Sequence, residues 1–240
     1  MIRTKISIQK LWQRGYEWDQ PLEHPEVKNW ESFFKVLKEL DEQELPRCLT
    51  PTGATGCPMI CIFADASKDA FGACAYLRWQ VEEGRYEVRF LAAKSRVAPL
   101  KELTIPRLEL QAEVLASRLY QTFQEECRIE FEKTILFTDS MIVYCWIKSI
   151  QRSFKPFVSA RVSEIQSKTD SSQWRHIPGD HNVADDFSRG ITVQELNKRW
   201  VHGPEFLTQA ESELPNDATP VDEKEEQSER RKILRCYNCK

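Results

Sequence analysis

The chain has 240 residues, of which 41% are hydrophobic and 30% charged, so it can form a packed core and is not wholly disordered. Its formal net charge of −3 shows no basic excess of the kind common in nucleic-acid-binding proteins. No apolar run approaches the roughly 18 residues of a membrane helix, and residues 1–20 do not resemble a secretory signal. With eight scattered cysteines, we expect an intracellular protein, cytoplasmic or nuclear, with mostly buried free thiols.

Residues 1–54 are predicted to form a helical connector. Within 27–40, apolar residues recur at helical spacing, which predicts one amphipathic helix packed on a neighbouring element. Proline and glycine residues over 46–58 indicate a turn-rich segment that leads into the next domain.

Residues 55–207 are predicted to form one α/β domain with a mixed sheet covered by helices. Short apolar runs predict strands, and the turn at 82–85 predicts a hairpin between two of them. Helical periodicity and start signals predict the intervening helices. The predicted strands are 59–64, 71–79, 86–92, 134–138 and 174–177, and the predicted helices are 106–125, 141–148, 157–168 and a short one capped by Asn182.

Residues 208–240 are acidic and then basic, with few aromatic side chains, which predicts a flexible tail. Cys236 and Cys239 near its end have the spacing of half a zinc site. Because further ligands are lacking in this chain, we expect no bound zinc there, only an exposed thiol pair.

Four acidic residues occupy special positions along the predicted domain. Asp65 and Asp139 each follow a predicted buried strand, and parallel neighbouring strands would bring both to the edge where open α/β sheets bind ligands. Glu109 and Asp185 lie near the starts of two predicted helices, with Asp186 as an alternative to Asp185. Each acid alone is more typical of a turn or a helix cap.

Four carboxylates brought together would repel one another and destabilise the fold. Two divalent ions would offset this repulsion, and hard oxygen ligands suit Mg²⁺ or Mn²⁺. A pair of such ions would support in-line displacement at a phosphodiester without a nucleophilic side chain.

The motifs around these acids resemble the ribonuclease H domain of retroelement polymerases. They read Phe-Ala-Asp-Ala-Ser at 63–67, Glu-Leu-Gln-Ala at 109–112, Phe-Thr-Asp-Ser at 137–140 and Asn-Val-Ala-Asp at 182–185. The segments 92–110, 174–178 and 186–190 resemble, more specifically, the Pao/BEL group of LTR retrotransposons. Residues 11–19 are similar to the segment that joins reverse transcriptase to ribonuclease H in that group, and residues 200–207 to the stretch that leads towards integrase.

This resemblance, over roughly 40–207, implies a polyprotein fragment with a five-stranded mixed sheet and helices on both faces. The implied activity is metal-dependent cleavage of the RNA strand of an RNA–DNA hybrid. It also implies the reverse transcriptase and integrase portions of the same polyprotein as partners. The implied metal ligands are Asp65, Glu109, Asp139 and Asp185. His181 would assist turnover, although it stands close to Asp185 in sequence, whereas His176 is interpreted as structural.

Hybrid recognition would rest on contacts to phosphates and 2′-hydroxyls. Candidate contacts are Ser67, Lys94, Arg96, Arg107 and Ser140. A solvated basic face explains the cations equally well, and Ser140 is also predicted to cap a helix.

Two other functions stay open at this stage. One is a catalytically silent, retrotransposon-derived module that binds nucleic acid or a protein partner. The other is a DNA-cutting transposase or integrase core, in which the glutamate would come last among three carboxylates.

Overall fold

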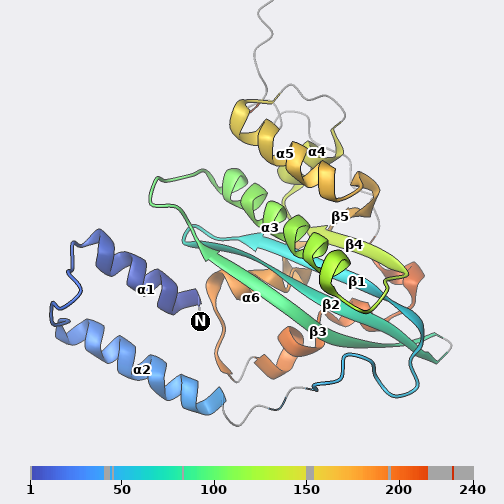
Figure 1. Cartoon of the computed structure of the whole chain (residues 1–240), viewed down its shortest axis with the longest axis horizontal. Helices are drawn as coiled ribbons and strands as arrows, with labels where there is room; N and C mark the ends of the chain where they lie inside the picture. Colours follow the sequence, from blue (N-terminus) through green and yellow to red (C-terminus); the bar gives the residue numbers. More distant parts are fainter. Residues whose placement is uncertain are drawn as a thin grey trace, which may run out of the picture.

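A five-stranded mixed sheet forms the centre of the molecule (Figure 1). The order of strands is β3-β2-β1-β4-β5, with β1, β2 and β3 antiparallel and with β4 and β5 parallel to β1. The strands are β1 (Thr55–Ala66), β2 (Ala70–Glu82), β3 (Arg85–Val97), β4 (Lys133–Thr138) and β5 (Trp174–His176). This computed structural model describes residues 2–40, 44, 46–82, 84–149, 154–193, 196–215 and 229.

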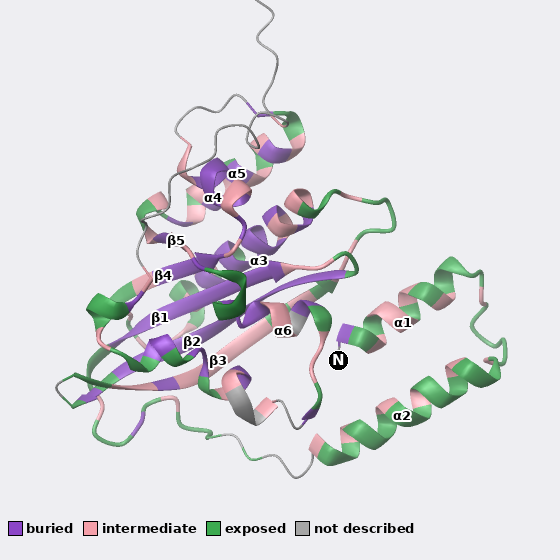
Figure 2. Ribbon diagram, turned by 180° about the vertical axis from the view of Figure 1, so that it is seen from behind, coloured by how far each residue is buried: buried purple, intermediate pink, exposed green. Residues whose placement is uncertain are grey.

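Helices cover both faces of the sheet, as expected (Figure 2). One face carries α3 (Ile105–Glu126), α4 (Met141–Lys148) and α5 (Pro156–Lys168). The other face carries α6 (Ala184–Arg189) and the short turn Glu205–Thr208. The predicted strands and helices of this domain are confirmed, but β1 begins at Thr55, inside the segment predicted to be turn-rich, because its first residues pair with β2.

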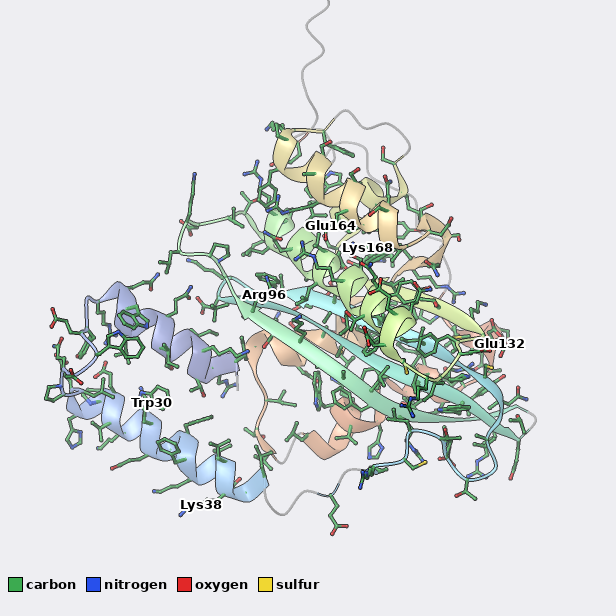
Figure 3. The ribbon with its side chains drawn as sticks, viewed as in Figure 1. Trp30, Lys38, Arg96, Glu132, Glu164 and Lys168 are labelled. Carbon is green, nitrogen blue, oxygen red and sulfur yellow. The ribbon has the colours of Figure 1, made fainter. Side chains whose placement is uncertain are left out.

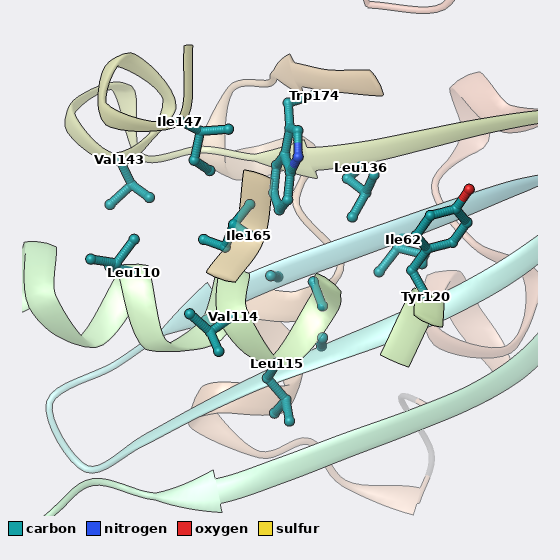
Figure 4. Close-up of a cluster of buried hydrophobic side chains, with 14 of the residues drawn as sticks. Ile62, Leu110, Val114, Leu115, Tyr120, Leu136, Val143, Ile147, Ile165 and Trp174 are labelled. Atoms are coloured by element: carbon teal, nitrogen blue, oxygen red, sulfur yellow. The ribbon is translucent and has the colours of Figure 1, made fainter. Parts of the chain in front are cut away.

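The larger core lies between the sheet and the helices α3, α4 and α5 (Figure 4). Small side chains at Ala112 and Ala116, both buried, let α3 approach the sheet closely. Larger side chains fill the space around them, among them Ile62, Leu110, Leu115, Leu136, Val143, Ile165 and Trp174. Burial of this apolar surface fixes α3, and with it Glu109, against the end of the sheet.

A second core covers the opposite face. The rings of Phe63 and Phe137 stack with centroids 4.7 Å apart, and Phe206 packs against both. Leu214 is 2% exposed there, and the Arg78 guanidinium donates to the carbonyls of Leu207 and Gln209 at 2.8 and 2.6 Å. The prediction of a flexible tail from residue 208 is therefore wrong for residues 208–215, since this segment buries apolar surface. The rest of the predicted tail, with Cys236 and Cys239, lies outside the described residues apart from Glu229.

Two helices precede the sheet, α1 (Ile2–Gln13) and α2 (His24–Leu40) (Figure 3). Their presence confirms the predicted helical character of the connector. The second helix is amphipathic, as predicted, and its apolar side faces α1, although none of its residues is fully buried. A cavity of about 670 Å³ lies between α1, α2 and the segment 190–200.

The expected buried thiols are only partly present. Cys61 and Cys74 are buried, and burial raises the pKa of the Cys61 thiol to about 12. Cys48 and Cys57 are exposed, because they lie in the connector and on the first, uncovered residues of β1. Among the helices that the structure describes, none is long and apolar enough to cross a bilayer.

Candidate active site

Two carboxylates emerge side by side where β1 and β4 end. These strands are parallel, and Phe63 lies opposite Phe137 in their register. Asp65 lies two residues after Phe63, and Asp139 lies two residues after Phe137. The parallel pairing that was expected to bring the two acids together is therefore present. Asp65 is 8% exposed, and Asp139 is half-buried.

The third carboxylate, Glu109, comes from α3 and is hydrogen-bonded by the segment that follows β4. The Ser140 hydroxyl donates to Glu109 Oε2 at 2.6 Å. The same serine is the N-cap of α4 and accepts from the amide of Val143 at 3.4 Å, as its position predicted. Glu109 is therefore tied to the residue directly after Asp139.

The last helix supplies two neighbouring acids with different partners. Asp185 Oδ1 pairs with the exposed Arg189 at 2.6 Å. Asp186 is bound through both oxygens by Arg199, at 2.7 and 2.8 Å. The helix also contacts the end of β1, because the Ser188 hydroxyl donates to Asp65 Oδ2 at 2.6 Å.

The carboxylates influence one another electrostatically. Burial raises the pKa of Asp65 to about 6, with further contributions from the charges of Asp139 and Asp185, and the Ser188 hydrogen bond opposes this rise. Burial is likewise the main cause that raises the pKa values of Glu109 and Asp139, and a nearby carboxylate adds to each. Carboxylates that are buried close to other negative charges form a site at which a cation is favoured.

The donor set fits a hard divalent cation such as Mg²⁺ or Mn²⁺, because it consists of carboxylate oxygens at a partly buried sheet edge. The carboxylate side chains do not converge on a single point in this structure. In the parts of the chain that the structure describes, no group of three His, Cys, Asp or Glu side chains could hold a metal ion as it stands. Asp65, Glu109 and Asp185 instead bind Ser188, Ser140 and Arg189.

Asn182 is a site residue whose role the sequence reasoning missed. It is completely buried, and its amide donates to the Ala64 carbonyl at 2.9 Å while its oxygen accepts from the Ala184 amide at 3.1 Å. The Asn182 amide also lowers the pKa of the Asp139 carboxyl, against the larger opposing effect of burial. The sequence predicted only a helix cap here. The signal that could have revealed this role is an amide side chain that lies between the candidate acids Asp139 and Asp185 in the sequence, next to apolar residues.

The two histidines of the following loop occupy different environments. His181 is exposed, and its ring lies 5.9 Å from that of Phe206, on the second face of the sheet. His176 Nε2 lies 3.1 Å from the backbone oxygen of Asp139. His176 therefore supports the backbone of the site, whereas no contact joins His181 to a carboxylate among the described residues.

The predicted substrate contacts are dispersed. Lys94 and Arg96 are exposed on β3, opposite Ala73 and Phe71 of the α3-side core (Figure 3). Arg107 is bound by Glu229 through two hydrogen bonds of 3.0 and 3.1 Å. The two candidate serines form hydrogen bonds within the fold. The Ser67 hydroxyl bonds the backbone of Ala70 in the β1–β2 turn, and the Ser140 hydroxyl bonds Glu109.

The sheet order, the strand directions and the convergence of the acids define a ribonuclease H-like protein. The chain belongs to the Pao retrotransposon-like RNaseH-like domain family, whose model matches residues 1–140. This match contains Asp65, Glu109 and Asp139 and ends before Asp185.

Solved structures with limited similarity include several ribonucleases H. The N-terminal RNase H domain of a Mycobacterium tuberculosis protein is 13% identical, with a TM-score of 0.39, and the match covers 55% of this chain and 94% of that one. RNase H1 of Halobacterium salinarum is 15% identical, with a TM-score of 0.34, over 54% and 91%. LC11-RNase H1, solved in complex with an RNA/DNA hybrid, is 17% identical, with a TM-score of 0.38, over 58% and 99%. No curated protein matches the chain.

Proposed function

We propose that this protein is a metal-dependent endonuclease that hydrolyses the RNA strand of RNA–DNA hybrids by a two-metal-ion mechanism. The observation that carries the proposal is the set of carboxylates from β1, α3, β4 and α6 at one edge of the sheet, where burial and neighbouring negative charge raise the pKa values of Asp65, Glu109 and Asp139. Membership of an RNaseH-like domain family supports the same reaction class.

Asp65, Glu109, Asp139 and Asp185 are the proposed metal ligands. When bound, a pair of Mg²⁺ or Mn²⁺ ions supplies a water of lowered pKa and stabilises the charge that develops on the leaving oxygen. Asp185 must leave Arg189, whose side chain is 74% exposed, and an exposed pair of this kind costs little to break. Ser140 holds Glu109 in place, and the Asn182 amide lowers the pKa of Asp139.

The proposed substrate is an RNA–DNA hybrid, gripped at its phosphates by Lys94, Arg96 and Arg107. For Arg107 this requires that its guanidinium release the Glu229 carboxylate, to which it donates two hydrogen bonds. His181, which lies in the loop before Asp185, is the candidate that assists turnover. The reverse transcriptase and integrase portions of the same polyprotein are proposed as partners on family membership alone.

The decisive experiment incubates the purified chain with a hybrid labelled on its RNA strand, with Mg²⁺ and with EDTA, beside an Asp139→Asn variant. We expect internal cleavage of the RNA by the wild-type chain with Mg²⁺ only. The variant removes a proposed ligand with almost no change in side-chain volume. Equal hydrolysis by both proteins would show that the cleavage does not arise at this site.

A catalytically silent module that binds nucleic acid or a protein partner is the second candidate. It is favoured by one observation: Asp65, Glu109 and Asp185 each have a hydrogen-bond or ion-pair partner within the fold. It predicts hybrid binding, or none, without any cleavage that depends on Mg²⁺. Gel-shift titration with the same labelled hybrid in EDTA distinguishes the two functions.

A further inference from the structure

The first helix, α1, carries an excess of positive charge. It contains three cations, Arg3, Lys5 and Lys10, and no acid, whereas α2 contains three lysines and three glutamates. All three cations of α1 are exposed. The whole chain has a net charge of −3, so this positive charge is concentrated on one element. Such a concentration is typical of a surface that binds a polyanion.

Hydrogen bonds hold α1 at the edge of the sheet where the proposed metal ligands lie. The start of α1 is bonded to the end of α6. Further along the helix, the Gln9 amide donates to the Ala98 carbonyl, directly after β3, at 2.7 Å. Between these contacts, Lys5 Nζ lies 3.5 Å from the backbone oxygen of Ser95 on β3. Figure 1 shows the first turn of α1 beside α6 and the end of β3. The cations of α1 are therefore placed next to the candidate active site.

The register of the sheet gives the distance between this edge and the carboxylates. Asp65 lies opposite Gly72 of β2, and Gly72 lies opposite Ser95 of β3. Neighbouring strands are about 4.8 Å apart, so Ser95 lies about 10 Å from Asp65 across the sheet. Duplex DNA carries about one charge per 1.7 Å of its axis, and a hybrid has the same charge per base pair. A hybrid with one phosphodiester at Asp65 can therefore place further phosphates at the β3 edge.

Two cations of β3 lie beside those of α1. Lys94 and Arg96 flank Ser95 and are exposed, and no ion pair joins them to an acid among the described residues (Figure 3). Lys10 lies 4.0 Å from Asp69, with side-chain exposures of 56% and 55%. An exposed pair of this kind is weak, so Lys10 can bind another anion. We call the exposed surface formed by four of these cations the α1–β3 surface: Lys5, Lys10, Lys94 and Arg96.

We propose that α1 is a nucleic-acid-binding element, and that Lys5 and Lys10 bind phosphates of the hybrid beside the cleaved bond, together with the cations of β3. The identity of the ligand as a hybrid rests on the proposed function, but its binding requires no cleavage. A lysine binds a phosphate as a point charge and reads no base edge. The α1–β3 surface therefore adds affinity and orientation without sequence preference.

The test measures the binding of a fluorescently labelled RNA–DNA hybrid to the full chain by anisotropy, in EDTA so that no metal-dependent cleavage occurs. Lys5→Gln and Lys10→Gln each remove one charge from α1, and Lys5→Arg keeps the charge. Lys38→Gln is the matched control, because Lys38 is an exposed lysine of α2 that points away from the sheet (Figure 3).

The dependence of affinity on salt distinguishes a phosphate contact from an indirect effect. Each lost phosphate contact lowers the slope of log K against log salt concentration by about 0.9. We therefore expect Lys5→Gln to bind the hybrid about eightfold more weakly at about 0.1 M salt, with the difference disappearing towards about 1 M. Lys10→Gln should behave in the same way. Lys5→Arg and Lys38→Gln should stay within about twofold of wild type.

Unchanged affinity and slope in both glutamine variants of α1 overturns the proposal, as does an equal loss in Lys38→Gln or a wild-type chain that binds no hybrid. Displacement of the labelled hybrid by poly-glutamate as readily as by unlabelled hybrid overturns it in favour of an acidic protein partner. If circular dichroism shows that Lys5→Gln does not fold, Lys10→Gln provides the same comparison.

The binding surface and the nuclease can fail separately. A chain that binds the hybrid through α1 but cleaves none with Mg²⁺ refutes the nuclease and leaves the α1–β3 surface in place. A chain that cleaves the hybrid with Mg²⁺, and whose binding is the same in Lys5→Gln and Lys10→Gln as in wild type, refutes the role of α1 and leaves the nuclease.

Discussion

Arg199 engages both carboxylate oxygens of Asp186, whereas the adjacent Asp185 pairs through one oxygen with the exposed Arg189. The Asp186 pair is the better shielded of the two, with side-chain exposures of 38% for Arg199 and 19% for Asp186. A bidentate pair of this kind is strong and geometrically fixed. The two neighbouring acids are therefore committed differently, which supports Asp185 as the fourth proposed ligand and gives Asp186 a structural role.

The first prediction separates these two acids. Asp185→Asn should reduce hybrid cleavage more strongly than the roughly 10–100-fold that supporting groups contribute to metal sites, with little loss of stability. Asp186→Asn should keep most of the activity but lower the melting temperature, because Arg199 loses its partner. Cleavage rates and thermal melts of the two variants check this. The reverse pattern would make Asp186 the ligand.

The second prediction concerns Asn182. Asn182→Ala leaves the Ala64 carbonyl and the Ala184 amide without their partner inside the core, which should cost about 1–3 kcal/mol of unfolding free energy. It also removes the amide that lowers the pKa of Asp139, so the acid limb of the activity profile should move to higher pH.

Thr169→Ala is the control for this change. Thr169 is also buried and satisfies the Trp174 indole and the Ile165 carbonyl, at a place with no contact to the carboxylates. It should lose stability without a shift of the pH profile. If both variants shift the profile equally, Asn182 has no specific influence on Asp139.

The third prediction follows from the raised pKa of Asp65. Its folded value of about 6 exceeds the ordinary value of 3.8, so between these two pH values the metal-free folded chain holds a proton that the unfolded chain has already released. Stability should therefore fall as the pH rises through this window. Asp65→Asn should stabilise the chain in EDTA by about 2 kcal/mol at about pH 7.5, and by little at about pH 4.

Urea unfolding in EDTA and in excess Mg²⁺ measures this effect. Mg²⁺ should stabilise the wild-type chain more than Asp65→Asn, because binding to the folded state adds to stability and the variant lacks a ligand. An Asp65→Asn variant that is less stable than wild type in EDTA at neutral pH would contradict the raised pKa of Asp65.

Much of the sheet could be predicted because its strands carry strong local signals. Met59 to Ala64 is a continuous apolar run, and α3 combines a proline at its start with an apolar stripe. The juxtaposition of Asp65 and Asp139 followed once these strands were taken as parallel neighbours. Local sequence was enough here because each acid stands at the end of a strand, and the fold class sets the direction of both strands.

Other features depend on contacts between residues far apart in sequence. Leu214 lies in an acidic, tail-like composition, yet it is buried against a sheet face whose shape no local pattern reveals. The periodicity of α2 predicted a helix with an apolar face, but it could not tell that this face lies opposite α1.

The last prediction tests whether α1 is part of the nuclease fold. Arg3 donates to the carbonyls of Arg189 and Gly190 at 3.2 and 2.7 Å, and so ties α1 to the end of the helix that carries Asp185. Gly190 has a φ of +79°, and a side-chain carbon there would lie 2.9 Å from Arg3 Nε. Gly190→Ala should therefore combine backbone strain with displacement of Arg3.

Gly84→Ala is the matched control, because Gly84 has a φ of +74° but has open space where a side-chain carbon would lie. We expect each variant to lose about 1–2 kcal/mol from the left-handed backbone. Gly190→Ala should lose more and should also weaken Mn²⁺ binding, since α6 shifts when Arg3 is displaced. Arg3→Ala should reproduce only that extra part. Identical losses in the two glycine variants, with unchanged Mn²⁺ affinity, would show that α1 rests on the domain without influencing Asp185.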